Sequence, residues 1–77
     1  MSEKFNGWAN RDTWVLALWI SNDKRNYDFV GRNKAKLLKL DKINLILALK
    51  RNLKIGDRFN WAKVNITEIK KMIREDF

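Results

Sequence analysis

Apolar residues recur along this chain in blocks, and each block predicts a helix. The first block is the continuous run from Trp14 to Ile20, which follows Asn10, a residue type suited to cap a helix N-terminus. Periodicity alone also allows a buried strand here, but the cap and the strong helix formers within the run favour a helix. Because apolar side chains surround its axis, we expect this helix to lie at the centre of the fold.

A second helical segment spans residues 24–38 with a weaker pattern. Gly31 lies in its middle, where glycine costs about 1 kcal/mol relative to alanine. We therefore expect a break or a kink at residues 31–33.

The third segment has the clearest helical spacing. Asp41 is suited to cap it, and Ile43, Ile46, Leu49 and Leu53 recur on one predicted face. Gly56 follows three residues after this stripe, so we expect it to close the helix as a C-terminal cap.

The last helix is predicted to start at Asn65. Glu68 stands three residues further on, as in a capping box, although Asn replaces the usual Ser or Thr. Ile66, Ile69, Ile73 and Phe77 form its predicted buried stripe. Residues 57–63 read as a connection that carries the aromatic pair Phe59 and Trp61.

These segments predict an all-α fold, a compact bundle of three to four short helices in a single small domain covering residues 1–77. The chain has no proline, which permits long helices, and no cysteine, which excludes disulfides and fits a reducing cytoplasm. We expect no signal peptide, because the first four residues are polar and no adequate apolar run follows them, and the longest apolar run is seven residues. We therefore expect no membrane span.

Charge is unevenly distributed along the chain. The net charge is +8, yet residues 1–31 are neutral, with four basic and four acidic side chains. Residues 32–74 carry thirteen Lys and Arg against three acidic residues. Such segregation indicates a polyanionic partner, and its alternative is an ordinary solvated lysine-rich face.

Candidate catalytic chemistry is almost absent. The chain contains no histidine and no cysteine, so the usual base at neutral pH and the strongest nucleophile are both missing. Scattered carboxylates are better explained as helix caps and first-turn acids than as a catalytic pair. We expect a protein that is not an enzyme and that has no cofactor and no metal site.

The basic half supplies the candidate binding site. The cations of the last helix fall within an arc of about 100°, and those of the third helix line its end and the following connection. If these segments pack together, their side chains can grip phosphates. The candidate nucleic-acid-binding residues are Lys50, Arg51, Lys54, Arg58, Trp61, Lys63, Lys70, Lys71 and Arg74.

The tryptophans have two interpretations. Trp14 and Trp19 are expected in the core, whereas Trp8 and Trp61 lie outside the predicted helices and are the better candidates for exposure. Trp61 stands among cations and could stack on an unpaired base. The structural alternative, that it closes one end of the bundle, is favoured because a small domain needs its large apolar side chains.

The N-terminal segment reads Asn-Gly-Trp-Ala-Asn-Arg-Asp-Thr-Trp over residues 6–14, followed by Leu-Trp-Ile and then Asn-Asp. It resembles a family of small proteins from bacteriophages, plasmids and bacterial genomes with the motif N-G-W-x-N-x-x-T-W…L-W-I. Residues 64–70 fit the ending of that family, with Ile66 in place of its Trp. We interpret the motif as a structural clasp in which Gly7 adopts an unusual backbone angle, Trp8 is a lid and Asn10 is the cap.

The resemblance implies a phage or mobile-element origin, and location in the host cytoplasm, without implying an activity. Two functions remain open. The chain is either a basic protein that contacts DNA or RNA, or an accessory protein that docks on an acidic host protein and modulates a polymerase, nuclease or defence complex. A homodimer is compatible with either, and a purely structural role ranks below both.

Overall fold

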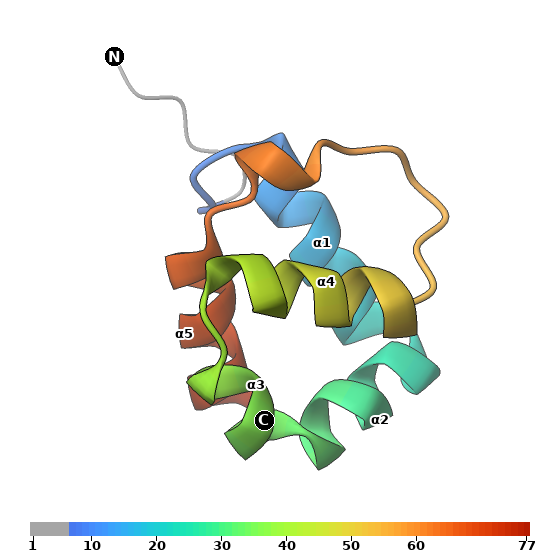
Figure 1. The fold of residues 1–77 in the computed structure, drawn as a ribbon. Helices are drawn as coiled ribbons and strands as arrows, with labels where there is room; N and C mark the ends of the chain where they lie inside the picture. Colours follow the sequence, from blue (N-terminus) through green and yellow to red (C-terminus); the bar gives the residue numbers. More distant parts are fainter. Residues whose placement is uncertain (1–6) are drawn as a thin grey trace.

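The computed structural model describes residues 7–77, which form helices and no β-strand (Figure 1). The prediction of an all-α fold is confirmed, although the described part of the chain holds five α-helices rather than three or four. In chain order these are α1 (Arg11–Asn22), α2 (Lys24–Arg32), α3 (Lys34–Lys39), α4 (Lys42–Asn52), the 3₁₀ helix η1 (Trp61–Lys63) and α5 (Ile66–Asp76).

The additional helix arises at the predicted break. Residues 24–38 divide into α2 and α3 at Asn33, whose backbone leaves the helical region at φ −110° and ψ 16°. The Asn33 side-chain amide donates to the carbonyl of Phe29 at 2.8 Å, so it ends α2 by bonding a carbonyl of the last turn. The break therefore falls inside the predicted range of residues 31–33.

Side-chain caps define the helix starts, as the sequence predicts. The Asn10 side chain accepts from the backbone N–H of Thr13 at the start of α1. Asp23 does the same for α2, and Asp41 accepts from the N–H of Asn44 at the start of α4. The local polar residues thus fix where these three helices begin, whereas α3 begins after Asn33 without a side-chain cap.

The predicted inner face of α4 is confirmed at Leu49, which is buried, and at Ile46 and Leu53, which pack half-buried against the core, but it is wrong at Ile43. Leu45 and Leu49 are fully buried, whereas Ile43 is 69% exposed. The segment carries so many aliphatic residues that more than one helical face matches the apolar spacing, and packing selects the Leu45–Leu49 face.

The predicted C-terminal cap of α4 is also wrong. The helix ends at Asn52, and Leu53 rather than Gly56 occupies the capping position. Gly56 has a different reason to be glycine, because a Cβ built there would lie 2.9 Å from Cη2 of Trp19. The residue lets the chain after α4 pass directly against the indole of α1.

We expect Gly56→Ala to destabilise the protein by about 1–2 kcal/mol, because the new methyl group displaces the Trp19 ring. Gly31→Ala is the matched control. A Cβ there meets only Cδ2 of Phe77, at an ordinary 3.8 Å. Removing a helical glycine should stabilise the protein by up to about 1 kcal/mol. Urea unfolding followed by circular dichroism measures both, and equal effects of the two substitutions would contradict the packing argument.

The last helix has the predicted cap and most of the predicted stripe. Asn65 accepts from the N–H of Glu68, and Ile66, Ile69 and Ile73 are buried. The reciprocal half of the capping box is wrong, because the Glu68 carboxylate accepts from the N–H of Ala9 at 2.7 Å instead.

The core lies between the five α-helices, with Leu37 as the contribution of α3, and is entirely aliphatic apart from Met72. The large aromatic side chains pack around it rather than within it: Phe77 is half-buried and lies against Tyr27, with ring centroids 4.6 Å apart. The described helices are each too short or too polar to cross a bilayer.

The N-terminal motif forms a clasp between the start of α1 and the segment around η1. Asn10 Oδ1 accepts from the Thr13 hydroxyl at 2.8 Å, and this hydroxyl accepts in turn from the N–H of Asn65 at 2.8 Å. The amide nitrogen of Asn10 donates to the carbonyl of Lys63 at 2.7 Å. Gly7 has φ +89°, the left-handed value that the interpretation of the motif requires. Asn6 lies outside the described residues.

Candidate nucleic-acid interface

The connection between α4 and η1 is held on the surface of α1 by three hydrogen bonds. Trp19 Nε1 donates to Asp57 Oδ2 at 2.9 Å, and Arg11 donates to the carbonyl of Arg58 at 3.3 Å. The backbone N–H of Asn60 donates to Asp12 Oδ1 at 2.8 Å. Although residues 53–60 contain no helix, side chains of α1 fix their course.

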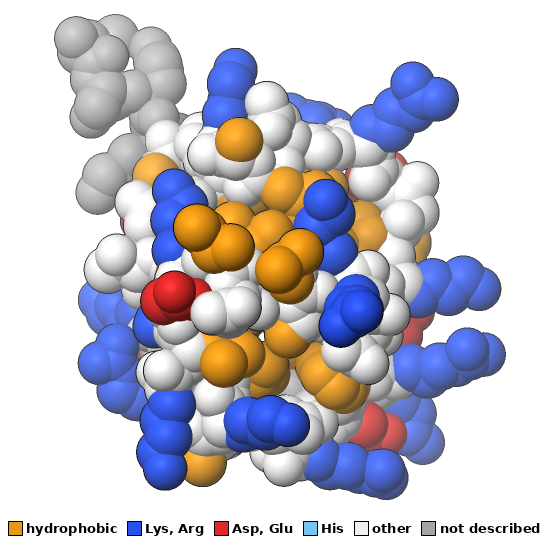
Figure 2. Space-filling view, in the orientation of Figure 1, with side chains coloured by type: hydrophobic (Ala, Val, Ile, Leu, Met, Phe, Trp, Pro, Cys, Tyr) orange, Lys and Arg blue, Asp and Glu red, His pale blue; other side chains and the backbone are white. Residues whose placement is uncertain are grey.

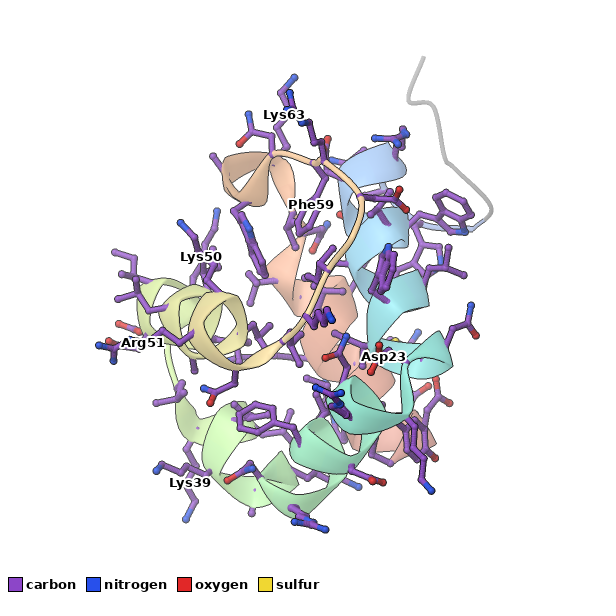
Figure 3. All side chains as sticks on the ribbon, turned by 90° about the vertical axis from the view of Figure 1, so that its right-hand side faces the viewer. Asp23, Lys39, Lys50, Arg51, Phe59 and Lys63 are labelled. Carbon is purple, nitrogen blue, oxygen red and sulfur yellow. The ribbon has the colours of Figure 1, made fainter. Side chains whose placement is uncertain are left out.

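This connection builds an open groove with the end of α4. Its cations are Lys50 and Arg58, both exposed, and its aromatic surface comes from Phe59 and Trp61, both half-buried. One carboxylate, Asp57, also lines it and accepts from the indole of Trp19. The two rings lie with centroids 4.7 Å apart at an angle of 48°. Figure 3 shows Lys50 on α4, Phe59 on the connection and Lys63 on η1. We call the set of residues Lys50, Arg58, Phe59 and Trp61 the aromatic groove.

A second groove begins on the other side of η1. It is lined by Lys42, Lys63 and Lys70 together with residues 64–67. The ammonium group of Lys70 donates to the carbonyl of Leu40 at 2.6 Å, which draws this side chain towards the α3–α4 junction. Since Trp61 and Lys63 both belong to η1, the two grooves meet at this short helix.

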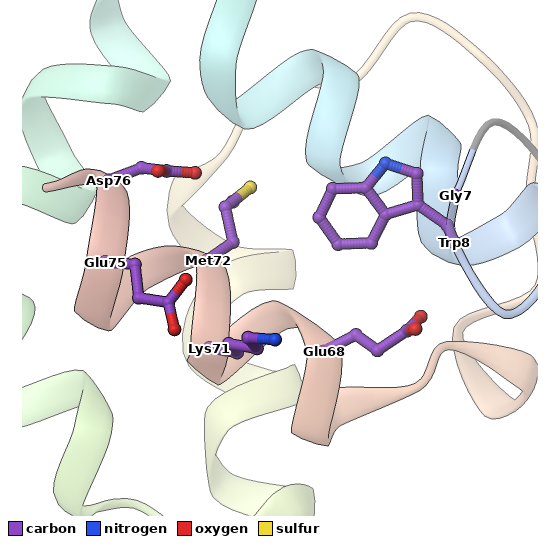
Figure 4. A pocket seen from close by; sticks show the side chains of 7 residues that line it. All are labelled: Gly7, Trp8, Glu68, Lys71, Met72, Glu75 and Asp76. Carbon is purple, nitrogen blue, oxygen red and sulfur yellow. The ribbon is translucent and has the colours of Figure 1, made fainter.

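Lys71 has different surroundings. It lines a pocket with three carboxylate side chains, Glu68, Glu75 and Asp76, below the half-buried indole of Trp8 (Figure 4). These carboxylates lower the local positive potential, so a phosphate is disfavoured beside Lys71. The remaining candidates Arg51, Lys54 and Arg74 are exposed and line neither groove.

The structure therefore divides the sequence-predicted cations among several surfaces. It brings Lys50, Arg58 and Trp61 together, and it places Lys63 and Lys70 in the adjoining groove. Sequence reasoning left Phe59 and Lys42 out of the site. The signal for Phe59 was present, because it precedes Trp61 by two residues in a segment without apolar periodicity.

The tryptophans are intermediate in burial. Trp14 and Trp19, expected in the core, are only half-buried. Trp8 and Trp61, the candidates for exposure, are half-buried and pack against the core, as the favoured structural interpretation of Trp61 predicts. Trp61 thus combines a structural contact with one edge that remains open to the aromatic groove.

Within residues 7–77, no three carboxylates gather closely enough to hold a metal ion. The arrangement of the aromatic groove instead offers two kinds of contact: flat apolar ring surface and mobile cationic side chains. This combination suits a ligand that is planar and anionic.

The fold and the grooves define a small, basic, all-α protein with an aromatic-lined cationic surface. The chain belongs to the family of unknown function DUF7249, whose model matches residues 1–76. Neither a curated protein nor a solved structure matches the chain.

Proposed function

We propose that this protein is a small non-enzymatic nucleic-acid-binding protein, and that it holds a single strand in the aromatic groove. The observation that carries the proposal is that the Phe59–Trp61 pair lines one groove together with Lys50 and Arg58. Bases stack on aromatic side chains with about 1–3 kcal/mol per base, and flanking cations bind the phosphates. A duplex keeps its base faces covered and cannot use the rings in this way.

The neighbouring cations extend this contact. Lys63 follows Trp61 by two residues on η1, and it lines the second groove together with Lys42 and Lys70. A strand that stacks on Trp61 can therefore continue over η1 with its phosphates near these three ammonium groups. A net charge of +8 also accelerates the approach of any polyanion.

The cellular setting belongs to the same proposal. The resemblance of the N-terminal motif to proteins of phages and plasmids supports an origin in a mobile element. Such a protein would work in the cytoplasm of the bacterial host, where single-stranded DNA and RNA of the element are present.

Fluorescence anisotropy with labelled single-stranded DNA, single-stranded RNA and duplex DNA tests this function at about 50 and about 200 mM salt. We expect single strands to bind with micromolar affinity at the lower salt and to lose most of it at the higher salt. Absence of binding at about 50 mM salt would refute the proposal.

A pair of double variants tests the location. Lys50→Ala with Arg58→Ala should weaken single-strand binding by about 10- to 100-fold and reduce the salt slope by roughly 1–2. Lys71→Ala with Arg74→Ala removes the same charge on α5 and should change affinity by less than about threefold. Equal losses in the two double variants would show a general charge effect and would reject the aromatic groove.

Trp61→Leu tests stacking separately. It should weaken single-strand binding by about tenfold while leaving any duplex binding unchanged, because only unpaired bases reach the ring. Circular dichroism checks that the variant remains folded. An equal loss for both ligands would contradict stacking.

A further inference from the structure

Helix α4 carries aliphatic side chains on two faces. Leu45 and Leu49 point into the core and have no exposed surface. Ile43 and Leu47 point outward, with 69% and 50% of their surface exposed. Because they are four residues apart, they lie side by side along the helix. We call this pair the outer stripe of α4.

The outer stripe differs from the other exposed apolar side chain among the described residues. Tyr27 is 45% exposed, but its ring already lies against Phe77. Ile43 and Leu47 instead form a contiguous branched-aliphatic surface, the type of anchor that a helix presents to a partner at i and i+4.

Two cations continue the outer stripe. Lys50 and Arg51 follow Leu47 by three and four residues, which places them next along the same side of the helix, whereas Lys42, which precedes Ile43, lines the second groove. All three are exposed, and α4 contains no acidic residue. Figure 2 shows hydrophobic side chains gathered over α4 with Lys and Arg around them. The nearest carboxylate in sequence, Asp41, is engaged as the helix cap.

We propose that the outer stripe of α4 docks an acidic amphipathic helix of a partner protein. Its aliphatic side chains would cover Ile43 and Leu47, and its carboxylates would pair with Lys50 and Arg51. This chemistry follows from charge complementarity around an apolar anchor. It assigns a surface to the protein-contact hypothesis raised by the sequence.

Two other occupants fit the surface less well. A second copy of this chain would bring another +8 charge and the same cations against the stripe, since a two-fold contact pairs like surfaces. An anionic bilayer would satisfy the cations, but two aliphatic side chains on a helix whose other leucines face the core offer little area for insertion.

This inference is independent of nucleic-acid binding. Ile43 and Leu47 line neither groove, and only Lys50 is shared with the aromatic groove. Substitutions in the outer stripe should therefore leave single-strand affinity within about twofold of the unmodified protein. The two proposals can fail separately.

The probe is a labelled synthetic helix of about five turns with Leu on one face and Glu elsewhere. Anisotropy at about 150 mM salt should give micromolar binding to the intact protein. The double variant Ile43→Ser with Leu47→Ser should weaken binding of the probe at least about tenfold, because both aliphatic side chains that the probe would cover are removed. A peptide of the same composition, with its Leu residues spread around the helix, should bind at least about tenfold more weakly than the probe.

The folded state of the double variant is checked by its melting temperature, which should change little because both side chains are exposed. Equal binding by the double variant, or equal binding of the two peptides, would overturn the proposal, because either result means unspecific attraction of charge. Failure of the probe to bind would also overturn it. Vesicle binding or dimerisation that is lost in the double variant, without peptide binding, would assign the stripe to a membrane or to a second copy.

Discussion

Asn26→Ala should cause the largest loss of stability among the polar substitutions, about 3 kcal/mol. Asn26 is 1% exposed and uses both ends of its side-chain amide. Its nitrogen donates to the carbonyls of Trp19 and Lys54, and its oxygen accepts from the N–H of Lys54 at 2.9 Å. Removing the amide breaks three hydrogen bonds, each of which contributes about 1 kcal/mol, and leaves both backbone groups of Lys54 without these partners, while the Trp19 carbonyl keeps the N–H of Asp23 at 3.3 Å.

The position of Asn26 explains why its loss should affect the whole fold. The side chain belongs to α2, bonds a carbonyl in the last turn of α1 and holds the chain just after α4. It therefore connects three elements through one residue. Because residues 53–60 begin there, loosening Lys54 should also disturb the aromatic groove that these residues build.

Urea unfolding monitored by circular dichroism measures the effect, and the melting temperature should fall by roughly 15 °C. Asn52→Ala is the matched control. Asn52 is exposed and donates only within its own helix, to the carbonyl of Ala48 at 2.8 Å. It should cost less than about 0.5 kcal/mol. A loss below about 1 kcal/mol for Asn26→Ala would contradict the assigned role.

The sequence predicts those features of the fold that depend only on neighbouring residues. Asn10, Asp23, Asp41 and Asn65 cap helices because a short polar side chain reaches N–H groups two or three residues ahead, and this depends on nothing else in the fold. The break at Asn33 follows from the same local competition.

Features that depend on distant residues escape such reasoning. The partner of Asn26 is 28 residues away, so nothing near Asn26 distinguishes it from the exposed Asn22. Gly56 sits where a helix cap is plausible, but its neighbour is an indole on α1. Helical spacing alone also placed Ile43 on the inner face of α4, whereas packing against the other helices leaves it exposed.

The candidate site was partly predictable for the same reason. The proposed polyanionic ligand follows from the net charge and from the position of Trp61 among cations, both of which are visible in the sequence. The division of the cations requires the fold, because Lys70 and Lys71 are adjacent in the chain yet line different pockets. Adjacent residues point about 100° apart around a helix axis, so Lys71 lies among carboxylates while Lys70 does not.

Substitutions at Asn10 should separate its two roles, which are to cap α1 and to donate a hydrogen bond to the carbonyl of Lys63. Asn10→Ala removes the helix cap, the acceptor for the Thr13 hydroxyl and the bond to Lys63, so we expect a loss of about 2–3 kcal/mol. Asn10→Asp keeps both acceptor roles and suits the positive end of α1, but it cannot donate to the Lys63 carbonyl. Its loss should be smaller, about 1–2 kcal/mol.

The ranking of these variants decides why the motif has Asn rather than Asp at this position. Urea unfolding should give the order Asn, Asp, Ala from most to least stable. If Asn10→Asp matches the unmodified protein, the bond to Lys63 contributes nothing, and if it matches Asn10→Ala, the cap contributes nothing. Because η1 carries both Trp61 and Lys63, releasing the Lys63 carbonyl should let this helix shift. Asn10→Asp should then weaken single-strand binding severalfold at a temperature where the variant is still fully folded. If Asn10 acted on stability alone, binding at that temperature would be unchanged.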